Sequence, residues 1–136
     1  MTNQKTLSII KPDAIKAGHE DAINLKIEEA GLKILEKKKL TLTKEQAQQF
    51  YLVHADKPFY NELCNFMTSG PIIVQILEGE NAIELYRKVM GSTNPEEADE
   101  NTIRKQFATS IQENAVHGSD SEENALKELN YFFKES

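Results

Sequence analysis

A histidine beside a glycine turn is the most chemically suggestive feature of the chain. His117 lies in the run NAVHGSDS at residues 114–121, between a short apolar piece and an acid-rich helix start. An imidazole is a nucleophile when it is neutral, as a free imidazole mostly is at pH 7. The segment therefore indicates nucleophilic chemistry at His117, and a histidine held at a turn for purely structural reasons is the alternative.

The two arginines of the chain are the next candidates. Of its 16 basic residues only Arg87 and Arg104 are arginines. A chain that otherwise uses lysine can keep arginine where a planar fork must bind a phosphate or carboxylate in two-pronged fashion. Two structural ion pairs would explain the same count, so the count makes both arginines candidates for anion binding without assigning that role to them.

Alternating strand and helix patterns must position these side chains. Strands are expected at residues 6–10, 32–42 and 72–77, with a short extended piece at 115–116. Helices are expected at about 21–30, from Thr43 through Phe50, from Pro58 to Met67, at 82–90 and at about 121–133. Residues 92–116 lose this periodicity except near 102–107, and a loop of that length in a compact domain is usually functional.

Several local details can be tested in the structure. Lys37, Lys38 and Lys39 interrupt the second strand, which favours a protected sheet edge over a nucleic-acid contact. Thr43 and Gln46 have the spacing of a capping box. The run at 72–77 predicts a central strand. For the last helix we expect Ser121 or Asp120 as N-cap and an inward face formed by Ala125, Leu126, Leu129, Phe132 and Phe133.

The order of these elements predicts the fold class. It is that of a split β-α-β unit repeated, which gives an α+β sandwich with a mainly antiparallel sheet covered by helices. The length of 136 residues fits one domain over residues 1–136. Neither a G-x-G-x-x-G run nor a Walker A run occurs, so a phosphate must be held by other means.

Composition and charge exclude some classes of function. The net charge is −6, and the whole acidic excess lies in residues 96–136, which disfavours a general DNA-binding surface or an anionic membrane anchor. The single cysteine, Cys64, cannot form an internal disulfide, and residues 1–5 resemble no signal peptide. We therefore expect a cytoplasmic protein.

Taken together, the motifs resemble the nucleoside diphosphate kinase family over essentially the full length. The matching runs are TLSIIKPD at 6–13, PF at 58–59, MTSGP at 67–71, LEG at 77–79, MGSTNP at 90–95, TIR at 102–104 and the run at 114–121. The resemblance implies a ferredoxin-like fold with a four-stranded sheet. It also implies transfer of the terminal phosphate of a nucleoside triphosphate, typically ATP, to a nucleoside diphosphate, through a phosphohistidine at His117.

The resemblance also implies roles for individual residues. Glu128 would accept a hydrogen bond from the imidazole nitrogen that does not attack, and Ser119 would hydrogen-bond that glutamate. Arg87 and Arg104 would bind the β- and γ-phosphates. Lys11 would reach the γ-phosphate and the ribose 3′-hydroxyl. The other expected contacts are Asn114 on the same hydroxyl, Tyr51, His54 and Thr93 on the phosphate chain, and Phe59 and Ile111 around the base.

Magnesium and self-association are further implications. Mg²⁺ binds nucleotide phosphates with few protein ligands, and Asp120 would meet it through water, while also being able to cap the last helix. Family members assemble into tetramers or hexamers. The chain departs from the family pattern at Asp21, Asn101, Lys105 and Gln106, none of them a catalytic position, and three of these lie in or beside the loop that packs between subunits in the family.

Two other functions remain as alternatives. A catalytically silent nucleotide-binding or scaffold module could share the fold, and it is weakened because every expected catalytic position is filled. A nucleic-acid-binding regulator would need a basic surface, and only Lys37, Lys38 and Lys39 offer one. Without the resemblance, Glu128 would be interpreted as a solvated helix residue, Tyr51 and Phe59 as core residues, and Thr93 as a loop residue.

Overall fold

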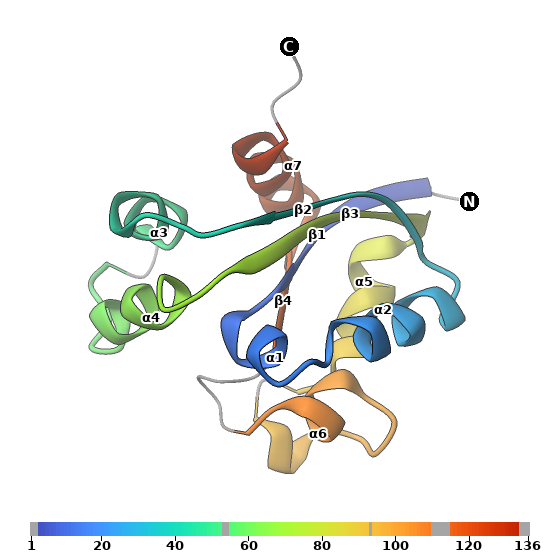
Figure 1. Ribbon diagram of the computed structural model, residues 1–136. Helices are drawn as coiled ribbons and strands as arrows, with labels where there is room; N and C mark the ends of the chain where they lie inside the picture. Colours follow the sequence, from blue (N-terminus) through green and yellow to red (C-terminus); the bar gives the residue numbers. More distant parts are fainter. Residues whose placement is uncertain (1–2, 53–54, 93, 110–114, 134–136) are drawn as a thin grey trace.

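A four-stranded antiparallel sheet organises the molecule (Figure 1). The computed structural model describes residues 3–52, 55–92, 94–109 and 115–133. Its strands are β1 (Asn3–Ile10), β2 (Lys33–Leu40), β3 (Ile72–Glu80) and β4 (Val116–Gly118), in the order β2-β3-β1-β4, and every neighbouring pair is antiparallel. This order is ferredoxin-like, which confirms the predicted fold class.

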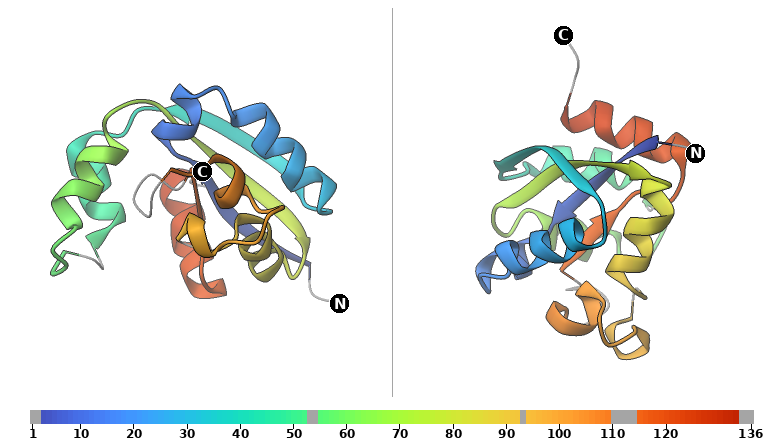
Figure 2. Two further views of the ribbon diagram at one scale, coloured as in Figure 1. Left: turned by 90° about the horizontal axis from the view of Figure 1, so that it is seen from below. Right: turned by 90° about the vertical axis from the view of Figure 1, so that its right-hand side faces the viewer.

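Helices cover both faces of the sheet (Figures 1 and 2). The helical elements are α1 (Pro12–Lys16), α2 (Glu20–Glu29), α3 (Lys44–Phe50), α4 (Tyr60–Met67), α5 (Ala82–Met90), the 3-10 turn η2 (Pro95–Glu97), α6 (Ile103–Phe107) and α7 (Glu122–Phe132). One face packs Ile10 and Leu77 against α2 and α5, and the other packs Leu7 and Val74 against α3, α4 and α7. None of the helices in the described ranges is long and apolar enough to cross a membrane.

The two central strands, β3 and β1, include the residues at which the sequence predicts strands. β3 is buried from Ile72 to Gln75 and runs three residues beyond the predicted end, to Glu80. β1 is buried from Thr6 to Ile10 and pairs with β3 over its whole length. Since β4 pairs with the other side of β1, these two strands carry the histidine segment on a rigid support.

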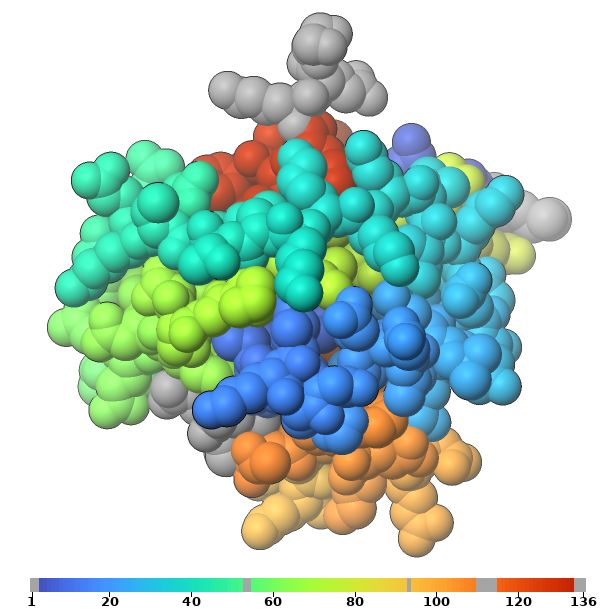
Figure 3. All heavy atoms as spheres, in the orientation of Figure 1, coloured from blue at the N-terminus to red at the C-terminus, as the bar shows by residue number. Residues whose placement is uncertain are grey.

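The lysine-rich strand is an edge strand, as predicted. β2 pairs only with β3 among the described strands, and Lys37, Lys38 and Lys39 are exposed. Figure 3 shows the β2 side chains standing out along one face of the molecule. Lys38 Nζ donates to the Phe132 carbonyl at 2.8 Å, so this lysine also caps the end of α7.

Other local predictions were right in part. Thr43 and Gln46 form both hydrogen bonds of a capping box, and the Ser121 hydroxyl accepts from the Asn124 amide at the start of α7. Leu126, predicted to face the core, is 64% exposed, whereas Ala125 is buried and Leu129, Phe132 and Phe133 belong to or pack against the core cluster. The predicted long loop after residue 91 contains η2 and α6.

Candidate functional site

The pairing of β1 with β4 brings Lys11 and His117 close together. Ile9 lies opposite His117 and Ile10 opposite Val116, and Lys11 follows directly after β1. The His117 side chain is 21% exposed, so most of the ring is packed while part of it stays accessible. His117 and Lys11 therefore lie at the same end of two neighbouring strands.

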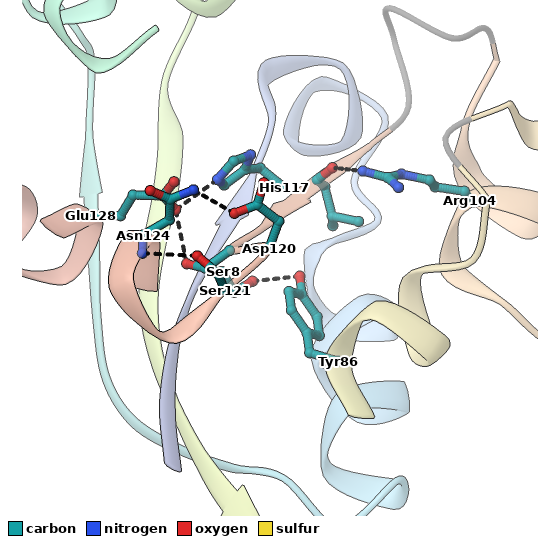
Figure 4. Close-up of polar contacts among 10 residues, drawn as sticks. Ser8, Tyr86, Arg104, His117, Asp120, Ser121, Asn124 and Glu128 are labelled. Atoms are coloured by element: carbon teal, nitrogen blue, oxygen red, sulfur yellow. Dashed lines mark hydrogen bonds and ion pairs between the residues drawn. The ribbon is translucent and has the colours of Figure 1, made fainter. Parts of the chain in front are cut away.

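The Glu128 carboxylate holds the imidazole (Figure 4), and a hydroxyl in turn holds this carboxylate. His117 Nε2 lies 3.0 Å from Glu128 Oε1, and Ser119 Oγ donates to the same oxygen at 2.8 Å. Ser119 is buried, and Glu128 lies about two turns into α7, whose start is fixed by the Ser121 cap. The local fold of residues 119–128 thus directs one carboxylate oxygen at one imidazole nitrogen.

Aromatic rings from the end of α3 also contact the imidazole. The Phe50 ring meets the His117 ring edge-on at 5.5 Å between centroids, and the Tyr51 ring does so at 6.4 Å. Tyr51 is buried, and this burial raises the pKa of its hydroxyl above the ordinary range, so that the phenol stays protonated. These contacts limit the orientations of the ring.

The two arginines flank a polar cavity of about 380 Å³. Its lining includes Arg87, Met90, Gly91, Ser92, Arg104 and Gly118. Arg104 is buried, and its guanidinium donates to the carbonyls of Gly91 at 3.2 Å and Val116 at 2.9 Å. Burial lowers the pKa of Arg104 from its ordinary value, but arginine stays charged near pH 7. Arg87 is exposed on the same cavity, which therefore carries two positive charges next to the His117 strand.

Gly118 leaves no room for a larger residue between β4 and α5. A Cβ at this position would lie 2.7 Å from both Met90 Cε and Tyr86 Cδ2. The Tyr86 hydroxyl in turn shares a 2.7 Å hydrogen bond with Ser8 Oγ on β1, the residue opposite Gly118. The helix that carries Arg87 is thereby held close against the strand that carries His117.

Lys11 brings a third cation to the site. Its side chain is buried, and desolvation, helped by the neighbouring charge of Arg104, lowers the pKa of Lys11 to about 8. The Asp13 carboxylate acts in the opposite direction, favouring the charged ammonium. The charges of Lys11 and Arg104 therefore interact in the folded protein, although the two residues are 93 positions apart in the sequence.

Asp120 is an exposed carboxylate beside the same site. Its Oδ1 accepts a 2.6 Å hydrogen bond from Asn124 Nδ2, and this bond is the main cause of a pKa lowered below the ordinary aspartate value. The charges of Arg87 and His117 add to the effect. The helix-cap alternative is fulfilled by Ser121, which leaves the second oxygen of Asp120 for other contacts.

The other predicted site residues divide into two groups. Phe59, which lies just before α4, is 45% exposed. His54, Thr93, Ile111 and Asn114 lie outside the described residues. The expected hydrogen bonds among His117, Glu128 and Ser119 are present, whereas the roles of all these residues in catalysis stay predictions.

Sequence reasoning missed three residues that shape this site. Phe50, Asp13 and Gly118 each contact it, Asp13 by accepting a hydrogen bond from the Ala115 amide at 3.1 Å. Phe50 and Asp13 are far from their partners in the chain, so no local spacing connects them. A glycine between a histidine and a serine was a usable signal for close backbone packing at Gly118.

Comparison with known proteins agrees with this geometry. Residues 4–136 match the model of the family described as nucleoside diphosphate kinase. A nucleoside diphosphate kinase from Methylobacterium radiotolerans is 57% identical over 136 residues, covering 100% of this chain and 97% of its own. One from Rhodospirillum centenum is 57% identical over 133 residues, covering 98% of this chain and 95% of its own.

Solved structures show the same fold. A crystal structure of the Aquifex aeolicus nucleoside diphosphate kinase superposes with a TM-score of 0.96 at 41% identity, covering 98% of this chain and 96% of that one. The apo enzyme from Encephalitozoon cuniculi gives 0.94 at 34% identity, with 97% and 90% covered. The chain therefore belongs to the nucleoside diphosphate kinase family, and it is an enzyme that transfers the terminal phosphate of a nucleoside triphosphate to a nucleoside diphosphate.

Proposed function

We propose that His117 carries the phosphate between the two nucleotides, as a phosphohistidine formed on Nδ1. The observation that carries this proposal is the 3.0 Å contact of Nε2 with Glu128 Oε1. Because that oxygen also accepts from Ser119, Nε2–H is the natural donor to it. The lone pair of the neutral imidazole then lies on Nδ1, which is the nitrogen left to attack.

The reaction proceeds in two half-reactions at one site. Nδ1 attacks the γ-phosphorus of the triphosphate, a P–N bond forms, and the bond to the β-phosphate oxygen breaks, so that a nucleoside diphosphate leaves. A second diphosphate then attacks the phosphohistidine with its terminal oxygen, the P–N bond breaks, and the imidazole is restored. Glu128 stabilises the imidazole each time positive charge develops on it.

The cations of the site bind the phosphates. Transferring a phosphoryl group spreads negative charge over its oxygens, so positioned positive charge is the main catalytic device. Arg87 and Arg104, on the walls of the polar cavity, contact the β- and γ-phosphates, and Lys11 contacts the γ-phosphate and the ribose 3′-hydroxyl. The further contacts in this proposal are Asn114 on that hydroxyl and Tyr51, His54 and Thr93 on the phosphate chain.

The base binds between an aromatic and an aliphatic side chain. Phe59, which is 45% exposed, is one side of the proposed sandwich, and Ile111 is the second side. Neither side chain can donate or accept a hydrogen bond, so neither reads the edge of a base. The enzyme is therefore expected to accept all common bases.

Magnesium is the proposed cofactor, held mainly by the nucleotide phosphates. The chemistry of Asp120 fits this role: it is an exposed hard oxygen donor, its lowered pKa favours the ionised carboxylate, and it is oriented by Asn124. When bound, Mg²⁺ neutralises phosphate charge and orients the transferred group. Asp120 would hold one of its waters, while the arginines and Lys11 supply the remaining positive charge.

The remaining expectations complete the proposal. Residues 1–136 form a single domain, which acts in the cytoplasm as a homo-oligomer, either a tetramer or a hexamer. Two core clusters on one continuous sheet support the single domain. Light scattering on the purified protein would decide the subunit number.

Labelling of the enzyme tests the central step. The protein is incubated with γ-labelled ATP and Mg²⁺, and the phosphoprotein is tested for the acid-labile, base-stable behaviour of phosphohistidine. We expect label in the parent and in a His19→Asn control and none in His117→Asn, with nucleotide binding retained. A silent nucleotide-binding module would give no label in any of the three, and label retained by His117→Asn would exclude His117 as the nucleophile.

A further inference from the structure

Ala115, two residues before His117, has an unusual backbone conformation. Its φ is +73°, in the left-handed region, and its side chain is fully buried. Residues with a Cβ rarely adopt this region, and they keep it only when surrounding contacts hold it. Something near Ala115 must therefore fix the chain at the point where β4 begins.

Two hydrogen bonds from the β1–α1 turn hold Ala115. The Lys11 amide donates to the Ala115 carbonyl at 2.8 Å, and the Ala115 amide donates to Asp13 Oδ2 at 3.1 Å. Lys11 and Ala115 are the next pair in the β1–β4 register, after Ile10 and Val116. Together the two bonds extend the pairing of the strands by one residue.

The helix start explains why a side chain completes this pair. In a regular ladder a backbone carbonyl of β1 would accept from the Ala115 amide. The Lys11 carbonyl instead accepts from the amides of Ala14 and Ile15 at 3.1 and 3.2 Å, because α1 begins there. The Asp13 carboxylate takes its place as the acceptor.

We propose that Asp13 is a positioning residue, which fixes Ala115 in its left-handed conformation and thereby sets where the His117 strand begins. The consequence for catalysis rests on the proposed role of His117. Asp13 acts through the backbone of residues 115–117, and three functional groups depend on that backbone. They are the His117 ring, Arg104 through its hydrogen bond to the Val116 carbonyl, and Lys11 through the hydrogen bond from its amide to the Ala115 carbonyl.

Three substitutions separate this role from a charge effect on Lys11. Asp13→Asn keeps an oxygen acceptor and removes the charge, whereas Asp13→Ala removes both. Ala115→Gly removes the conformational penalty, because glycine adopts positive φ readily. Asp21→Ala, an exposed aspartate at the start of α2, is the matched control.

Single-turnover phosphorylation at saturating ATP measures the effect on catalysis. We expect Asp13→Ala to lower the rate of phosphoenzyme formation about tenfold or more, since a small misplacement of reacting groups is costly, while nucleotide affinity changes by less than about threefold. Asp13→Asn and Asp21→Ala should stay within about threefold of the parent. An Asp13→Ala rate equal to the parent's, or an Asp13→Asn rate as low as that of Asp13→Ala, would overturn the proposal.

Amide exchange and melting tests do not depend on the chemistry of His117. The Ala115 amide should exchange slowly in the parent and in Asp13→Asn and faster in Asp13→Ala; equal protection in all three would contradict the proposed bond. If Asp13→Ala is too unstable for kinetics, Asp13→Ala/Ala115→Gly should melt at a higher temperature than Asp13→Ala, and a lower or equal melting temperature would refute the role of φ. If His117→Asn still transferred phosphate, the proposed nucleophile would fail while these results stood.

Discussion

The Arg104 side chain donates to the carbonyl of Val116, the residue immediately before His117, with Nη2 and oxygen 2.9 Å apart. The same guanidinium donates to the Gly91 carbonyl at 3.2 Å and lines the polar cavity. Arg104 therefore joins the end of α5 to the histidine strand while it contributes positive charge to the cavity. Arg87 contributes charge to the same cavity from an exposed position.

This difference between the arginines predicts different effects of lysine substitution. Arg104→Lys should lower both thermal stability and kcat, because a lysine cannot reach two carbonyls and a phosphate in the same way. Loss of hydrogen bonds from a charged donor corresponds to about 1.5–3 kcal/mol in the free energy of unfolding. Arg87→Lys should lower kcat with almost no change in stability.

Thermal melting and steady-state kinetics on both variants check this prediction. Equal melting temperatures would show that the backbone contacts of Arg104 contribute little. Rates within about twofold of the parent for both would show that neither guanidinium stabilises the transition state.

Glu128 and Ser119 predict a graded loss of rate. Glu128→Gln keeps the size of the side chain but removes the negative charge that stabilises the imidazole, so kcat should fall by about 100-fold or more. Ser119→Ala removes one hydrogen bond, of about 1 kcal/mol, and should cost about five- to tenfold. Rapid-quench measurement of phosphoenzyme formation separates these steps from product release, and a larger effect of Ser119→Ala than of Glu128→Gln would contradict the proposed order.

The buried Lys11 is expected to raise activity while it lowers the stability of the fold. In the folded protein its pKa is about 8, below the ordinary value of 10.5, so between these pH values the unfolded chain binds a proton that the folded chain does not. This group therefore destabilises the fold fully below pH 8 and less as the pH rises from about 8 to 10.5. Lys11→Met should raise the free energy of unfolding at pH 7 by on the order of 1–3 kcal/mol and lower kcat about 100-fold or more.

Denaturant unfolding at several pH values tests the sign of this effect. The stability advantage of Lys11→Met should shrink above pH 8, and an advantage that grows with pH would show the opposite linkage. In the parent, kcat/KM should fall as the pH rises through about 8, when free enzyme loses the ammonium.

Gly118 predicts a steric effect close to the nucleophile. In Gly118→Ala the new Cβ must displace Met90 or Tyr86, and overpacking of this kind costs about 1–3 kcal/mol. The rate of phosphoenzyme formation should fall as well, because β4 is pushed away from α5. Gly70→Ala is the matched control, since a Cβ there meets only Pro12 Cβ at 3.7 Å. Thermal melting and phosphoenzyme labelling of both variants test this prediction. Equal melting temperatures and equal labelling rates would show that α5 moves aside without loss of stability or activity.

Substrate scope tests the proposed base and sugar contacts. Adenine, guanine, cytosine, uracil and thymine diphosphates should differ in kcat/KM by about one to two orders of magnitude at most, the range of stacking strengths. A 2′-deoxy sugar should be accepted, and a 2′,3′-dideoxy sugar should lose far more, because Lys11 and Asn114 would be left unpaired. Strict preference for one base, or indifference to the 3′-hydroxyl, would contradict these assignments.

Local sequence signals predicted most of the framework. The capping box at Thr43, the central strand from Ile72, the lysine-marked edge strand and the Ser121 cap depend on neighbours within a few residues, and all are present. Leu126 was placed wrongly because a helix pattern gives the apolar face but not how much of it the sheet covers. α1 escaped notice because five residues are too few for a periodic pattern.

Only those residues of the site that belong to recognisable sequence motifs could be predicted. His117 was singled out from the residues of its own segment, Glu128 followed from a resemblance in sequence, and the contact between them is present. The contact of Asp13 with Ala115 and that of Phe50 with His117 span 102 and 67 positions, and they arise from strand register and helix packing. Nothing local in the sequence encodes such pairs.

The Phe50 ring has a consequence for the entropy of the reaction. Besides His117, it contacts Phe132 of α7 at 5.1 Å and its own neighbour Tyr51 at 4.9 Å between centroids, so the ring is packed between the end of α3 and α7. A rotation of the imidazole that displaced this ring would have to disturb its packing on Tyr51 and Phe132. The orientational freedom of the nucleophile is thus largely lost when the chain folds, and little of it remains to be lost each time a nucleotide binds.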